Sequence, residues 1–120
     1  MSRKHYELRA WQRSIELVKA VHRLTASFPS AENFGLTAQI RRCAVSVPCN
    51  IAEDAARNSK KEFLHFLGIA RGSLSELETQ YIIANELGYL HCEESMRQNL
   101  DEIFGLLSGL INSLKKATRE

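Results

Sequence analysis

The sequence lacks the features of membrane-spanning, secreted and disulfide-stabilised proteins. It contains no apolar run of roughly 18 residues, the length that a membrane-spanning helix needs. Its basic N-terminal segment is not followed by the apolar stretch of a secretory signal. Cys43, Cys49 and Cys92 are too few and too unevenly spaced for a disulfide framework. We therefore expect a reduced, cytoplasmic protein without membrane contact.

The sequence also lacks the residue patterns of common catalytic sites. The four histidines and three cysteines are not spaced as zinc ligands, and no glycine-rich phosphate loop is present. Ser46, Glu53 and Ser73 have no histidine at a spacing that would activate a serine. We expect no enzyme activity, no cofactor and no bound metal.

The net charge is small but unevenly distributed. It is +2 overall, yet residues 1–71 hold 12 Lys/Arg and 6 Asp/Glu, while residues 72–120 hold 4 Lys/Arg and 8 Asp/Glu. A basic half fits a surface for an anionic partner. It fits equally well the association of the basic half of one copy with the acidic half of another, or a solvated surface with no partner.

Four segments show the 3.6-residue hydrophobic period of amphipathic helices. These predicted helices cover residues 9–27, 36–57, 60–87 and 93–117. Ser59 followed by Glu62 is the pattern of a capping box, and Gly88 suits the C-terminal end of the third helix. The apolar stripe expected on the first helix consists of Trp11, Ile15, Val18, Val21 and Leu24.

The helix pattern predicts an all-α protein with the architecture of an antiparallel up-down-up-down four-helix bundle, because short connections join neighbouring helices. A chain of 120 residues is long enough for one domain with its own core. We expect an N-terminal tail at residues 1–8 and the bundle domain at residues 9–117.

The third helix is apolar over more than one stripe, which either central burial or a subunit interface would explain, and we favour the interface. The apolar residues outside its main seam are Leu64, Ile69, Ile82 and Ile83. Two pairs of glycines also fall at matching levels of the third and fourth helices, which predicts a close approach between these helices. The pairs are Gly68 with Gly72 and Gly105 with Gly109.

The second helix carries a polar flank beside its apolar stripe, which two hypotheses explain. The first is a hydrogen-bonded network that fixes the register between the second and third helices. The second is a binding flank, either for RNA or for a small molecule in a pocket near Ser46, Asn50 and Glu53, beside the break in backbone hydrogen bonding that Pro48 introduces. The members expected in the polar network are Gln39, Ser46, Asn50, Glu53, Ser73 and Glu76.

Basic residues on the second helix, the loop after it and the early third helix are the candidate contacts to nucleic acid. Clustered together, they would neutralise several phosphates and give salt-sensitive binding. No base-reading motif and no interleaved aromatic residues accompany them. The candidates are Arg41, Arg42, Arg57, Lys60, Lys61 and Arg71.

Taken together, these motifs resemble the four-helix bundle family of proteins encoded in intervening sequences of 23S ribosomal RNA genes. The resemblance extends over nearly the whole chain. The residues that carry it are Trp11-Gln12, Phe28-Pro29, Leu36, Gln39-Ile40-Arg41-Arg42, Ser46-Val47-Pro48, Asn50-Ile51-Ala52-Glu53, Arg57, Glu62-Phe63, Phe66-Leu67, Ala70-Arg71-Gly72-Ser73 and Glu76-Leu77.

The resemblance implies a homo-oligomer, with a ring-shaped pentamer as the expected assembly, and no firmly assigned activity. Similar bundles accompany the reverse transcriptase of diversity-generating retroelements, where a basic surface binds nucleic acid and the polymerase. We therefore expect structured RNA or a ribonucleoprotein as the partner, bound through a basic surface that the ring repeats. The alternative is a protein-interaction scaffold without direct nucleic-acid binding.

Overall fold

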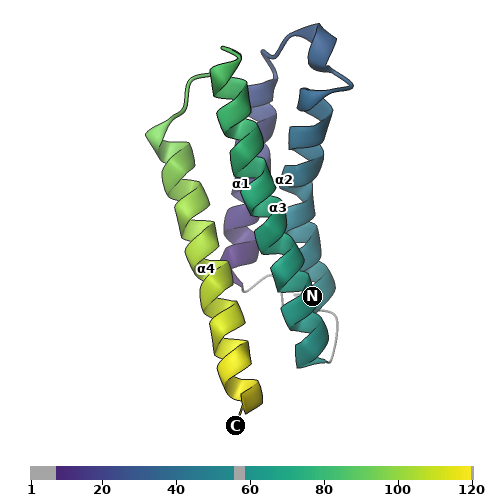
Figure 1. Cartoon of the computed structure of the whole chain (residues 1–120), viewed down its shortest axis with the longest axis vertical. Helices are drawn as coiled ribbons and strands as arrows, with labels where there is room; N and C mark the ends of the chain where they lie inside the picture. Colours follow the sequence, from purple (N-terminus) through teal and green to yellow (C-terminus); the bar gives the residue numbers. More distant parts are fainter. Residues whose placement is uncertain (1–7, 56–58, 120) are drawn as a thin grey trace.

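The computed structural model describes residues 8–55 and 59–119, which form four long α-helices and one 3-10 turn (Figure 1). Successive helices alternate in direction, and each packs against two others in the cycle α1–α2–α3–α4. The described residues therefore form the predicted all-α, up-down-up-down bundle, 50 Å in its longest dimension. The expected tail lies almost wholly outside them. The elements are α1 (Arg9–Thr25), η2 (Ser30–Glu32), α2 (Leu36–Ala55), α3 (Lys60–Glu86) and α4 (Glu94–Arg119).

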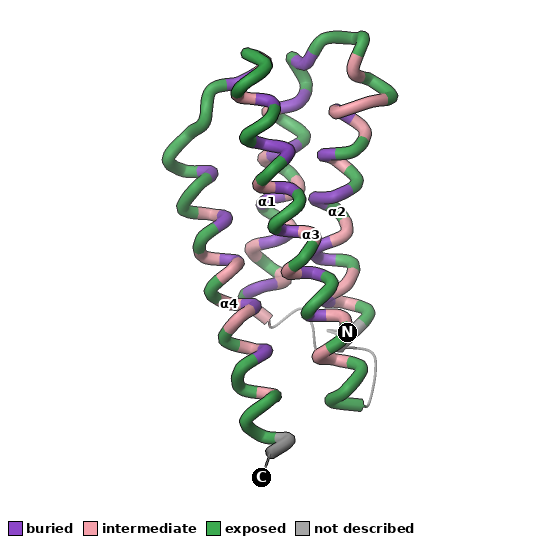
Figure 2. The backbone as a smooth tube through the Cα atoms, viewed as in Figure 1, coloured by how far each residue is buried: buried purple, intermediate pink, exposed green. Residues whose placement is uncertain are grey.

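A continuous aliphatic core runs along the inner faces of the helices (Figure 2). The apolar stripes predicted for α2, α3 and α4 supply most of it and are confirmed. Burying one such aliphatic side chain contributes about 1.5–3 kcal/mol. The large aliphatic side chains with the least exposure are Leu17, Ile40, Val47, Ile51, Leu67, Leu74, Leu77, Leu100, Ile103 and Leu107.

The stripe predicted for α1 is confirmed at Val21 but lies about one position away from the buried residues elsewhere. Ser14 and Thr25 are buried because their hydroxyls donate to the carbonyls of Trp11 at 2.7 Å and Val21 at 2.8 Å. Trp11 and its bulky neighbours along α1 are consequently only half-buried. The buried positions of α1 are Ala10, Ser14, Leu17, Val21 and Thr25. The half-buried ones are Trp11, Ile15, Val18 and Leu24.

The close approach predicted at the glycine pairs of α3 and α4 was also wrong. A Cβ atom added at Gly68, Gly72, Gly105 or Gly109 would meet no atom within 4 Å. All four glycines are exposed. They therefore lie on the outer surface of the bundle and form no tight contact between α3 and α4.

The predicted ends of α3 are confirmed. The Ser59 hydroxyl accepts a hydrogen bond from the amide of Glu62 at 3.3 Å, as an N-terminal cap does. At the other end Gly88 has a φ of +79°, and the amide of Tyr89 donates to the carbonyl of Ala84 at 3.0 Å. This is the geometry of a Schellman C-terminus, which glycine adopts without steric cost.

Glu32 ties together the two connections at the end of the bundle where α1 and α3 finish. Its carboxylate accepts hydrogen bonds from the amide of Leu36 at 3.1 Å and from the hydroxyl of Tyr89 at 2.8 Å. A Cβ atom at Gly35 would lie 2.8 Å from the same carboxylate. The Leu36 amide, and then Tyr89, lower the pKa of Glu32 below its ordinary value of 4.5. The turn that precedes α2 is therefore firmly held.

This geometry makes stability depend on acidity in a specific way. Because folding lowers the pKa of Glu32, its contribution is present above the unfolded pKa and is lost as pH falls through the folded pKa. We expect Glu32→Gln to lower the melting temperature at neutral pH and to differ less from the wild type below pH 4.5. Thermal unfolding followed by circular dichroism measures both. Glu16→Gln, which removes one exposed ion pair with Lys19, is the control. A Glu32→Gln deficit that stays constant with pH would contradict this account.

Candidate nucleic-acid interface

Arg41, the first of the candidate basic residues, forms hydrogen bonds within the bundle. Its Nε donates to the hydroxyl of Thr25 at 2.7 Å, and an Nη donates to the carbonyl of His22 at 3.4 Å. Both acceptors lie in the last turn of α1, where the helix dipole favours a positive charge. Arg41 therefore acts as a C-terminal cap for α1, and its side chain is half-buried.

Arg42 and Arg71 differ in how far their charges are available. Arg42 is exposed, and among the described residues no hydrogen bond or ion pair engages its guanidinium. Arg71 is half-buried between α3 and α4, where an Nη donates to the hydroxyl of Ser108 at 3.5 Å. Arg57 lies outside the described residues.

Lys60 and Lys61 are exposed in the first turn of α3. This position is near the opposite end of the bundle from Arg41 and Arg42, which lie in the first turns of α2 (Figure 1). Within one chain, the described candidates therefore form no single patch.

Two lysines of α4 join Lys60 and Lys61 at their end of the molecule. Since Arg71 lies opposite Ser108 and the two helices are antiparallel, residues 60–64 are level with residues 115–119. Lys115 and Lys116 are also exposed. We call these four side chains the lysine end: Lys60, Lys61, Lys115 and Lys116. The sequence analysis did not identify the α4 pair, although an antiparallel register would have placed it there.

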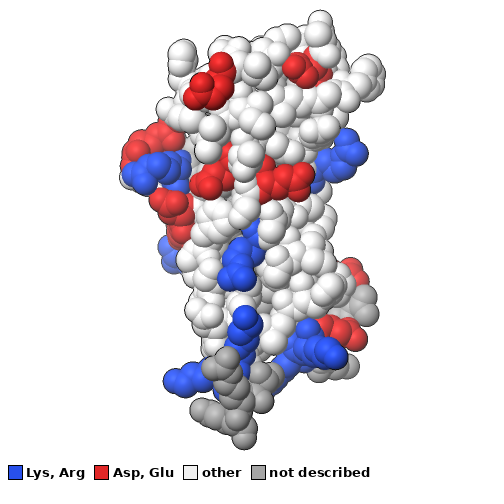
Figure 3. All heavy atoms as spheres, viewed as in Figure 1, with Lys and Arg blue, Asp and Glu red and all other residues white. Residues whose placement is uncertain are grey.

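Charge is separated along α3 and α4. Figure 3 shows basic side chains gathered toward the lower end of this face, with acidic side chains most numerous in the upper half. The sequence agrees, since residues 76–102 contain seven Asp/Glu and one Arg. The lysine end is thus remote from the acidic part of both helices.

The polar flank of α2 is bonded mainly within its own helix. The hydroxyl of Ser46 donates to the carbonyl of Cys43, and the amide of Asn50 donates to the carbonyl of Ser46, both at 2.7 Å. A link to α3 comes from the thiol of Cys43, which donates to the carbonyl of Ser73 at 3.0 Å. The predicted network is therefore local to α2 at Ser46 and Asn50, and it meets α3 through Cys43. Gln39, Glu53 and Glu76 are exposed.

A polar hollow of about 430 Å³ opens between α2 and α3. Gln80 is only 8% exposed, and its Oε1 has no hydrogen-bond partner among the described residues. Burial, and then Glu76, raises the pKa of the Cys43 thiol to about 11, which keeps the thiol protonated and unreactive. Of the residues expected around a small-molecule pocket, Ser46 alone lines this hollow. Its lining is Gln39, Arg42, Cys43, Ser46, Glu76 and Gln80.

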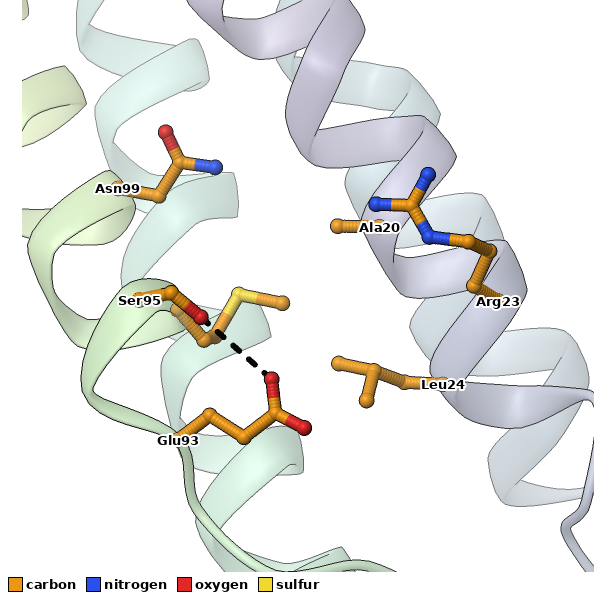
Figure 4. Close-up of a pocket in the computed structure, with 7 residues that line it drawn as sticks. Ala20, Arg23, Leu24, Glu93, Ser95 and Asn99 are labelled. Atoms are coloured by element: carbon orange, nitrogen blue, oxygen red, sulfur yellow. Dashed lines mark hydrogen bonds between the residues drawn. The ribbon is translucent and has the colours of Figure 1, made fainter.

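A second hollow, of about 320 Å³, lies between α1 and the start of α4 (Figure 4). Arg23 on α1 and Glu93 before α4 form opposite walls. The carboxylate of Glu93 accepts a hydrogen bond from the hydroxyl of Ser95 at 3.5 Å. Glu93 and Ser95 are both exposed to solvent.

Glu62-x-x-His65 has the spacing that di-iron bundles use, so the view that the sequence lacks such patterns was wrong at this point. Both residues are exposed on α3 rather than directed into the bundle core. Across residues 8–55 and 59–119, no three His, Cys, Asp or Glu side chains come together as potential metal ligands. None of the helices within those ranges is long and apolar enough to cross a membrane.

Comparison with known proteins identifies the family. Residues 6–109 match the model of the 23S rRNA-intervening sequence protein family. The chain belongs to this family. A search of the curated proteins finds no match. The description of the intervening-sequence family names no enzymatic activity.

Among solved structures, this member of the family is similar to the 1.70 Å crystal structure of a protein of unknown function from the S23 ribosomal protein family of Bacteroides thetaiotaomicron VPI-5482. The two are 18% identical with a TM-score of 0.60, over 92% of this chain and 99% of the other. At this identity the similarity shows a shared fold.

The contrast between Arg41 and Arg42 predicts separate effects on stability. Replacing Arg41 with Gln removes a charged donor from the end of α1, and we expect a loss of about 1–2 kcal/mol in the free energy of unfolding. Arg42→Gln should change it by less than about 0.5 kcal/mol, as exposed substitutions usually do. Urea denaturation at equal protein concentration measures both. Equal losses for the two variants would show that Arg41 does not cap α1.

Proposed function

We propose that the protein is a non-enzymatic homo-oligomer that binds structured RNA through the lysine end. The observation that carries this proposal is the exposure of four lysines at one end of α3 and α4, remote from the acidic part of the same helices. Such a surface attracts phosphate and releases counterions when it binds. Of the original candidates, Lys60 and Lys61 contribute directly, and Arg42 adds a separate exposed charge.

The placement of Lys60 and Lys61 supports a role outside the fold. They occupy the first turn of α3, where the helix dipole disfavours positive charge. Lys115 and Lys116, near the end of α4, are placed favourably for that helix. Two lysines whose charges interact unfavourably with the dipole of their own helix are more readily explained by a role in binding than by a role in stability.

The family description supports RNA as the anionic partner, because it refers to intervening sequences of 23S rRNA. Phe63, the aromatic residue beside Lys60 and Lys61, is partly buried against the core rather than presented for stacking on bases. Binding would therefore depend on phosphate position and RNA shape rather than on base sequence.

Self-assembly would repeat the lysine end and raise its avidity. The support is the outer surface of α3, where Ile69, Ile82 and Ile83 are 39%, 51% and 44% exposed. A second chain packed on this surface would bury them, and the exposed glycines of α3 would admit it closely. A pentamer is the assembly that the family resemblance favours.

A protein-interaction scaffold remains the second candidate. Arg41 and Arg71 favour it, because both already bond within the bundle and have fewer donors to offer phosphate. In this reading the polar hollow between α2 and α3 would contact a protein partner.

Salt-dependent RNA binding tests the proposal. We expect a labelled structured RNA to bind with an affinity that falls steeply between about 50 and 200 mM salt. Lys60→Gln/Lys61→Gln and Lys115→Gln/Lys116→Gln should each weaken binding and reduce the log–log salt slope by about 1.5, since each lost phosphate contact removes roughly 0.7–0.9. Fluorescence anisotropy supplies both values.

The matched control removes the same charge away from the lysine end. Arg23→Gln/Arg97→Gln also lowers the net charge by two, and both residues are exposed. We expect its affinity and slope to stay near those of the wild type. Equal losses of affinity in all three variants would show that RNA binding depends on net charge and not on the lysine end. No binding at low salt would favour the protein-interaction scaffold.

A further inference from the structure

Phe34 is an aromatic side chain held fully in solvent. It is 100% exposed, in the turn between η2 and α2. This turn is not loosely attached, because Glu32 bonds the Leu36 amide on one side of Phe34 and the Tyr89 hydroxyl across the bundle end. Exposing a large apolar ring on an anchored turn is unfavourable in an isolated chain, and it points to burial against another surface.

An apolar hollow of about 400 Å³ lies between α1 and α2. It exists because the bulky apolar residues of α1 flank the core instead of entering it. Val45 on its α2 side is 40% exposed. Lys19 is the charged residue in its lining, and Cys49 provides an exposed thiol. The apolar lining is Trp11, Ile15, Val18, Val45, Pro48 and Ala52.

Phe34 cannot reach this hollow within its own chain. Val45 lies nine residues beyond Leu36 along α2, which is about 14 Å at the rise of an α-helix. The ring and the hollow therefore need different molecules.

We propose that Phe34 of one copy inserts into the α1–α2 hollow of a second copy, and that this contact joins the subunits of the assembly. The inference rests on the self-assembly in the proposed function and adds to it a contact that is separate from the outer surface of α3. The two surfaces also differ in charge, since Glu32 lies beside Phe34 and residues 24–40 contain no Lys or Arg, whereas Lys19, which forms an exposed ion pair with Glu16 at 3.4 Å, edges the hollow. Phe34 supplies the buried anchor, and the flanking charges orient it.

RNA is a poorer occupant for either surface. An exposed aromatic ring can stack on a base, but such platforms lie in basic surroundings that hold the backbone. The turn around Phe34 has a carboxylate and no basic residue between positions 24 and 40. The hollow is likewise apolar apart from Lys19 and the thiol of Cys49.

The contact permits two kinds of assembly. If two copies exchange Phe34 reciprocally, the result is a closed dimer. If each copy inserts Phe34 into the next, the result is a ring when the rotation closes and a filament when it does not. The number of copies is therefore a measurable consequence of the contact.

The native Cys49 allows a direct test by disulfide trapping. Asn33 is exposed and precedes Phe34, so Asn33→Cys places a thiol beside an intact ring. The exposed Cys92 is replaced by Ser, and the buried Cys43 stays unreactive. After oxidation with diamide, we expect a non-reducing gel to show covalent oligomers whose largest closed species reports the number of copies, five for a pentameric ring.

Three variants decide the outcome. Adding Cys49→Ser should remove the cross-link, and adding Phe34→Ser should remove it although both thiols remain. The control Ser27→Cys/Cys92→Ser places an exposed thiol in a different turn at the same end of the bundle, and it should not cross-link to Cys49. Light scattering should show an assembly for the wild type and a lower mass for Phe34→Ser.

Each contrary result has a distinct meaning. A wild-type chain that is monomeric by light scattering would overturn the proposed self-assembly itself. An assembled wild type whose Asn33→Cys variant forms no cross-link to Cys49, or forms one that survives Phe34→Ser, would overturn this contact alone. A Phe34→Ser protein with unchanged mass but weaker RNA binding would overturn it in favour of base stacking.

Discussion

The lateral packing of α2 against α3 is the constraint on which the rest of the structure depends. Val47, Ile51, Leu67 and Leu74 are fully buried, and helices that are marginal alone persist because such stripes meet. The Cys43 thiol, donating to the carbonyl of Ser73, marks the register of this seam. With that register set, α1 and α4 close the bundle around the same core. The positions of the charged residues then follow from helix length and direction, which is how lysines from distant parts of the sequence reach one end.

Several arginines of this chain bond to other helices, whereas the lysines of the lysine end are exposed to solvent. Arg41 caps α1, while Arg9 and Arg13 bind Glu102 at 2.9 and 3.2 Å and tie α1 to α4. A guanidinium suits such contacts because its planar donors bond several acceptors at once. A lysine ammonium is strongly hydrated and remains in solvent more readily. The side chains of the lysine end are accordingly exposed, and the proposed RNA surface uses them without disturbing the arginine contacts that join the helices.

Hydrophobic periodicity was enough to predict the bundle, and the reasons for its failures are physical. It placed the α2, α3 and α4 stripes correctly, including the buried Ala44 and Ala70, because large aliphatic residues flank these alanines at helical spacing. On α1 it was right at Val21 but missed Ala10 and Ser14, which a hydrophobic pattern ranks low. It treated Arg41 as a surface charge because an acceptor at Thr25, 16 residues away, has no sequence signature. Phe34 was not singled out, since exposure of an apolar residue depends on the finished fold. The lysine end could not be predicted without knowing the register of α3 against α4.

We propose that the exposed lysines that the fold gathers at one end of α3 and α4 form the surface that contacts RNA. Lysine footprinting tests it most directly, with acetylation of the assembled protein compared in the presence and absence of a structured RNA at low salt. The account predicts protection of Lys60, Lys61, Lys115 and Lys116 by RNA, with no change at Lys19. Uniform protection of all lysines, or protection confined to Lys19, would contradict it.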